Sequence, residues 1–76
     1  MLAVATVKRT PNEFTAQASD ETWFRLAIMA DQQHLGGVSQ RIRTELSTPL
    51  EGDKQRRITF QPHEAEVIER MIETGR

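Results

Sequence analysis

Residues 14–46, FTAQASDETWFRLAIMADQQHLGGVSQRIRTEL, contain the pattern that decides the fold. The first five residues alternate between apolar and polar side chains, which is typical of a strand with one apolar and one polar face. Ser19 follows, and its hydroxyl can accept a hydrogen bond from a free amide in the first turn of a helix. The acidic residues after it suit the positive end of a helix. The stretch therefore predicts a strand and then a helix that begins at about Asp20.

The predicted first helix is apolar on nearly all sides. From Trp23 onward, only Arg25 and Asp31 interrupt a run of apolar residues. A surface helix in a small monomer needs a narrower apolar face. We therefore expect this helix to be covered on several sides, and a second copy of the chain is a plausible cover.

A glycine pair, Gly36-Gly37, is expected to end that helix, because one glycine can take the left-handed cap conformation. A second helix is expected over residues 38–46, where three apolar residues lie four apart and so share one face. Pro49 follows soon after and discourages continuation of the helix.

The same stretch resembles the ribbon-helix-helix DNA-binding family, the group of the Arc and methionine repressors and many plasmid antitoxins. The matching residues are Phe14-x-Ala16-x-Ala18-Ser19, Asp20-Glu21, Leu26-x-x-Met29-Ala30 and Gly37-Val38-Ser39-x-x-Ile42-Arg43-x-x-Leu46. In that family, two chains pair their strands into an antiparallel ribbon that enters the major groove of DNA. The resemblance implies a homodimer that binds duplex DNA as a transcriptional repressor or antitoxin-type regulator.

The family pattern assigns roles to particular residues of this chain. The resemblance implies that Glu13, Thr15 and Gln17 read bases and that the amides of Gly37 and Val38 hold a phosphate. Two basic residues in or near these parts, Arg9 and Arg41, are also expected to hold phosphates. The chemistry fits in part, because Gln17 can pair with an adenine edge and Thr15 can contact a thymine methyl group. The amides at the start of a helix form a natural anion site. Glu13 suits DNA only if it accepts a hydrogen bond from cytosine.

The flanking segments extend this core. Residues 2–7 are small, apolar and partly β-branched, which predicts a strand. Residues 10–13 suit a tight turn with proline in its second position, so the strand can form a hairpin with residues 14–18. A hairpin partner would widen a ribbon that must enter the major groove, which admits two strands. The first strand is therefore either a separate arm or part of a sheet that does not read DNA.

The C-terminal part predicts a further strand and helix. Residues 47–57 are polar and are expected to form a linker, with a small basic cluster of Lys54, Arg56 and Arg57 that could touch phosphates. Residues 58–76 then give a short strand and an amphipathic helix that starts near Pro62. The outer face of that helix offers a possible protein interface: Glu66, Glu69, Arg70 and Glu73.

Two fold arrangements follow, and both are small α+β domains. The first is a strand-helix-helix core over residues 14–46, dimeric, with residues 1–13 as an added strand or arm and residues 58–76 as a strand-helix extension. The alternative is a monomeric sheet-plus-helices domain of order β-β-α-α-β-α, because the second strand and helix echo the first. The alternative function is a small protein-binding module, a phage- or plasmid-type inhibitor or adaptor that acts through its acidic C-terminal helix or a sheet edge.

Composition limits the other classes of function. The chain has 76 residues, no cysteine and a net charge of −1, so we expect one domain, no thiolate site and a cytoplasmic location. No apolar run is long enough for a membrane helix. His34 and His63 lack a third ligand at helical spacing, so no metal or cofactor is expected. The serines lie in no nucleophile motif, and we do not expect an enzyme.

Overall fold

A three-stranded antiparallel sheet with β2 (Phe14–Ala18) at its centre organises the computed structural model, which describes residues 1–50 and 54–75. β1 (Ala5–Arg9) and β3 (Arg56–Phe60) pair with the two edges of β2. The remaining elements are α1 (Asp20–Gln32), α2 (Gly36–Leu46), the 3₁₀ turn η1 (Pro62–Glu64) and α3 (Ala65–Thr74). This order confirms the predicted β-β-α-α-β-α arrangement.

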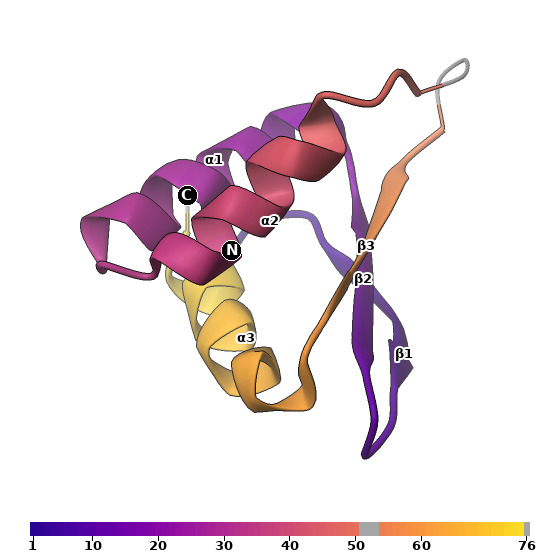
Figure 1. Ribbon diagram of the computed structural model, residues 1–76, viewed down its shortest axis with the longest axis vertical. Helices are drawn as coiled ribbons and strands as arrows, with labels where there is room; N and C mark the ends of the chain where they lie inside the picture. The colour runs from indigo at the N-terminus through magenta and orange to yellow at the C-terminus, as the bar shows by residue number, and fades with distance from the viewer. Residues whose placement is uncertain (51–53, 76) are drawn as a thin grey trace.

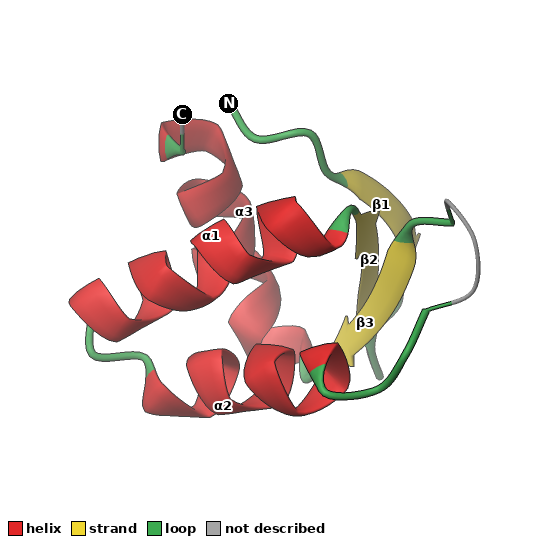
Figure 2. Ribbon diagram, turned by 90° about the horizontal axis from the view of Figure 1, so that it is seen from above, coloured by secondary structure: helices red, strands yellow, loops and turns green. Residues whose placement is uncertain are grey.

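The molecule has two layers, because the helices all lie on one face of the sheet (Figures 1 and 2). The core fills the space between the layers. Its largest fully buried side chains come from the sheet and from each of the three helices: Phe14, Trp23, Leu26, Ile42, Ile58, Ile68 and Met71. The opposite face of the sheet, which we call the outer face, carries no helix of the described residues. Within those residues, no helix is long and apolar enough to cross a membrane.

Several predicted boundaries are corrected by the structure. β3 begins at Arg56, so the last two residues of the predicted linker belong to a strand, and residues 51–53 of that linker lie outside the described residues. α1 ends at Gln32 and α2 already begins at Gly36. The left-handed residue between them is His34, with φ of 59°, and not a glycine. The hairpin between the first two strands is confirmed.

Arg56 is buried, which corrects its predicted place in a basic surface cluster. Its side chain is only 7 % exposed and makes an ion pair with Asp20, with Nε 2.7 Å from Oδ1. It also donates to the carbonyl oxygens of Glu45 at 2.6 Å and Thr48 at 2.7 Å, at the end of α2. This guanidinium therefore joins β3 to the start of α1 and the end of α2. Its hydrogen bonds to Asp20 lower the pKa of that carboxyl below its usual 3.8, against the burial that raises it.

α1 is covered on its inner side only. Trp23 is fully buried, and its indole Nε1 donates to the carbonyl oxygen of Arg56 at 2.9 Å. Phe24 and Ile28, on the other side of the helix, remain 50 % and 39 % exposed. Part of the apolar surface that the sequence predicted to need a cover is therefore open in the single chain.

Candidate functional site

The outer face of the sheet is a polar surface built by strand alternation. Side chains of directly opposed residues lie on the same face of a sheet. The pairing therefore aligns the outward side chains of the three strands in two rows. The buried residues that alternate with them along the strands point toward the helices. The first row is Ala5, Gln17 and Arg57, and the second row is Lys8, Thr15 and Thr59.

The second row is held by direct contacts. The hydroxyls of Thr15 and Thr59 lie 2.8 Å apart and share a hydrogen bond. Lys8 makes an ion pair with Glu13, whose Oε1 lies 2.6 Å from Nζ. In the first row, the Arg57 side chain is exposed and has no hydrogen bond or ion pair among residues 1–50 and 54–75. The centre of the outer face thus offers one available guanidinium beside amide and hydroxyl groups.

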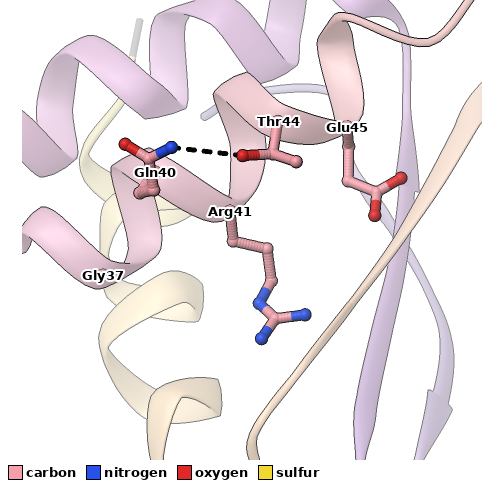
Figure 3. A pocket seen from close by; sticks show the side chains of 5 residues that line it. All are labelled: Gly37, Gln40, Arg41, Thr44 and Glu45. Carbon is pink, nitrogen blue, oxygen red and sulfur yellow. Dashed lines mark hydrogen bonds between the residues drawn. The ribbon is translucent and has the colours of Figure 1, made fainter.

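Arg41 adds a second cation at the edge of this face. The C-terminal part of α2 approaches β3, and Arg41 points from the helix toward that strand (Figure 3). Its guanidinium donates to the carbonyl oxygen of Thr59 at 3.3 Å. A shallow hollow of about 310 Å³ lies along this part of α2, lined by Gly37, Gln40, Arg41, Thr44 and Glu45. Lys8 and Arg41 therefore flank the β2–β3 pair on its two sides.

β2 with α1 and β3 with α3 form an internal repeat. Adding 42 to a residue number in the first unit gives its counterpart in the second, so Ala16 corresponds to Ile58, and Ser19 to Gln61. Ser19 and Gln61 both cap the helix or turn that follows the strand. Five counterpart pairs are apolar and buried on both sides: 16/58, 18/60, 23/65, 26/68 and 30/72. The predicted similarity between the two strand-helix segments is therefore also present in the folded structure.

The repeat places β2 and β3 in the register of a symmetric ribbon. In a two-fold symmetric antiparallel pair, the residue on the axis faces its own counterpart. Ala16 faces Ile58, which is its counterpart under the 42-residue shift. We call the β2–β3 pair the ribbon. A single chain supplies both of its strands, so a homodimer is not needed to complete it.

The structure brings together only some of the predicted DNA-contacting residues. Thr15 and Gln17 lie on the outer face, partly exposed. Glu13 precedes β2, and its carboxylate is held by Lys8. Arg9 faces Phe14 across the strands, on the helix side of the sheet, and pairs with Glu69 of α3 at 2.5 Å.

The predicted phosphate amides lie elsewhere. α2 begins at the end of the molecule away from the sheet and approaches the sheet only at its C-terminal end (Figure 2). Gly37 and Val38 therefore do not share a surface with Thr15 and Gln17. Gly37 and Val38 also line a second hollow together with Glu64, whose carboxylate would repel a phosphate.

The acidic side of α3 is largely open. Glu66, Arg70 and Glu73 are exposed, whereas the carboxylate of Glu69 forms an ion pair with Arg9. The spacing of Glu66 and Arg70 suits an ion pair, but none forms between these side chains in the described part of the chain.

Sequence reasoning did not place Lys8, Arg57 and Thr59 on one face, although it put Arg57 in a basic cluster that can touch phosphates. A signal for two of them was present, because Ile58 and Phe60 alternate with Thr59 and Arg57 and so place them on the polar face. The residues in the described ranges contain no group of three histidine, cysteine, aspartate or glutamate side chains that could hold a metal ion.

Comparison with known proteins gave no match: no family model, no curated protein and no solved structure is significantly similar to this chain.

Proposed function

We propose that this chain binds duplex DNA with the outer face of its ribbon, as a small repressor or antitoxin-type regulator related to the ribbon-helix-helix family. The observation that carries the proposal is the register of β2 and β3. It places the polar side chains of a symmetric ribbon on a sheet face that no described helix covers. The four side chains at its centre are Thr15, Gln17, Arg57 and Thr59.

The residue types suit base edges in the major groove. Arginine pairs with guanine O6 and N7, glutamine with adenine N6 and N7, and threonine with either polar edges or the thymine methyl group. Two strands about 4.8 Å apart fit a groove about 12 Å wide. The ribbon therefore matches the groove in both width and chemistry.

The cations beside the ribbon suit the walls of that groove. Lys8 lies on β1, next to one strand of the ribbon, and Arg41 lies beside the outer edge of the other strand. Phosphates line both sides of the major groove, so one cation can meet each backbone. The hairpin excludes a separate arm. The proposal therefore requires that only β2 and β3 enter the groove, while β1, the third strand, lies over one groove wall.

Glu13 opposes this binding. Its carboxylate neutralises Lys8 in the free protein and would lie near a polyanion in the complex. We therefore assign Glu13 to the control of affinity and not to base reading. Glu13→Gln should release Lys8 and strengthen DNA binding.

Fluorescence anisotropy with mixed-sequence duplex DNA across a salt series tests the proposal. With Lys8 and Arg41 each neutralising one phosphate, the logarithm of the binding constant should fall with the logarithm of salt at a slope of about −1.8. The double variant Lys8→Ala, Arg41→Ala should bring that slope closer to zero. Arg70→Ala removes an exposed arginine on the opposite layer and serves as the matched control. Absence of binding even at low salt would contradict the proposal.

A second candidate function is protein binding through α3. The observation that favours it is that Glu66 and Glu73 are exposed and have no ion pair within residues 1–50 and 54–75. Charge reversal at both positions should disrupt a complex without unfolding the chain, whereas an unchanged pull-down would contradict this role. Glu69 is left intact in that variant because Arg9 already holds it.

A further inference from the structure

The ribbon is symmetric in its register but not in its side chains. Under the 42-residue shift, Thr15 corresponds to Arg57, and Gln17 corresponds to Thr59. Two identical chains would present the same residues from both strands and would read a palindrome. Here one strand presents threonine and glutamine, while the other presents arginine and threonine.

The first row places the two most selective side chains opposite each other. Gln17 faces Arg57 directly across the ribbon. Side chains in such a pair start about 4.5–5.5 Å apart at their Cβ atoms. Base pairs are stacked about 3.4 Å apart along the duplex. The amide and the guanidinium therefore reach the same base pair or two adjacent ones.

The second row lies two residues along the strands, which is about 6.6 Å, or about two base pairs. The hydroxyls of Thr15 and Thr59 already bond to one another, which uses part of their hydrogen-bonding capacity. This row therefore favours the methyl group of thymine over polar base edges.

We propose that the ribbon recognises a short, non-palindromic duplex sequence with a guanine and an adenine on adjacent base pairs and a thymine about two base pairs away. Arg57 selects the guanine and Gln17 selects the adenine. This inference rests on the proposed DNA binding and specifies its target.

Selection from a duplex library with a randomised central segment tests the inference. The wild-type chain should enrich a motif with adjacent guanine and adenine and no internal two-fold symmetry. Arg57→Gln should change the preferred guanine to adenine and leave the rest of the motif intact, because glutamine reads adenine. Arg57→Ala should lose about 5- to 100-fold in preference at that one position. Arg70→Ala, the matched control, should enrich the wild-type motif.

The outcomes separate this inference from the proposed function. Binding of the library without an enriched motif, or enrichment of a palindrome, would overturn the inference and leave DNA binding in place. Retention of the guanine by Arg57→Gln, in a variant whose circular dichroism matches the wild type, would overturn the role of Arg57. Failure of the wild-type chain to bind any duplex at low salt would overturn both.

Discussion

The two halves of the internal repeat differ mainly on their outward sides. At inward positions both units are apolar, as in Leu26 with Ile68 and Ala16 with Ile58. At outward helical positions, α1 carries Phe24 where α3 carries Glu66. The comparison shows that packing against the shared core constrains the inward residues, while the outward residues can vary with what each surface contacts.

One inward pair breaks this rule. Phe14 is fully buried at the start of β2, and its counterpart at the start of β3 is the buried Arg56. An arginine is tolerated there because the carboxylate of Asp20 and the carbonyl oxygens of Glu45 and Thr48 satisfy its donors. The second unit thus uses a hydrogen-bonded cation where the first uses an aromatic ring.

Trp23→Ala should have the largest effect on the free energy of unfolding. It removes the core side chain by which the two halves of the repeat differ most in size. Trp23 is fully buried, packs 5.9 Å from the ring of Phe60 and corresponds to Ala65. Trp23→Ala should cost about 3–5 kcal/mol of unfolding free energy. A chain of this size is stable by only about 4–11 kcal/mol, so the loss is severe. Urea denaturation followed by circular dichroism measures it, and a loss below about 1 kcal/mol would contradict the packing.

Arg56→Ala should have the next largest effect. It removes hydrogen bonds from a charged group and leaves the carbonyl oxygens at the end of α2 without that partner, which should cost about 2–3 kcal/mol. Arg56→Lys keeps the charge but cannot reach the same set of acceptors, so it should recover only part of the loss. Full recovery by lysine in a denaturation experiment would show that charge alone matters at this position.

The Asp20–Arg56 pair should also make stability depend on pH. The pKa of Asp20 is lower in the folded chain than its usual 3.8, so the unfolded chain binds the proton more readily. This contribution is present above about pH 4 and is lost as the pH falls through the folded pKa. The contribution of this pair to the free energy of unfolding is modest, because the Asp20 side chain is 47 % exposed. Asp20→Asn should flatten the loss of stability between about pH 5 and 2, and an unchanged slope in that variant would exclude the pair as its source.

The smallest expected effect tests the outward positions. Phe24→Glu gives α1 the residue that α3 carries at the equivalent position. Because Phe24 is 50 % exposed, the free energy of unfolding should change by no more than about 0.5 kcal/mol. A larger loss in thermal or urea denaturation would show that the contact of Phe24 with Arg43, whose guanidinium carbon lies 5.9 Å from the ring centre, matters for folding.

Local patterns predicted the elements and the hairpin of β1 with β2, but not the pairing of β2 with β3. The alternation at residues 14–18 and the serine before Asp20 predicted β2 and the start of α1, because both depend on neighbouring residues. The pairing of β2 with β3 depends on residues about forty positions apart, which no local pattern specifies. For the same reason Thr15 and Gln17 were placed in the candidate site from the sequence, whereas the alternation around Ile58 marks Arg57 and Thr59 as polar-face residues but does not show that they lie beside β2.

The helix cap and the basic cluster show two other limits of sequence reasoning. The glycine pair predicted a left-handed turn within two residues of its actual place, at His34, because several residue types tolerate that conformation. Arg56 and Arg57 are neighbours of the same type, yet one is buried and one is exposed. The alternation of inward and outward side chains along β3 distinguishes the buried Arg56 from the exposed Arg57. The sequence predicted this strand to begin only after both residues, so it did not distinguish them.

The most direct test of the central claim is a ¹H–¹⁵N NMR titration of the labelled chain with a short duplex at low salt. Binding through the ribbon should shift the signals of Thr15, Gln17, Arg57 and Thr59 most strongly, with smaller changes at Lys8 and Arg41. Signals of the outward face of α3, including Glu66 and Arg70, should stay in place. Shifts concentrated on α3 or at the start of α2, or no shifts at all, would contradict the assignment of the outer face as the DNA-binding surface.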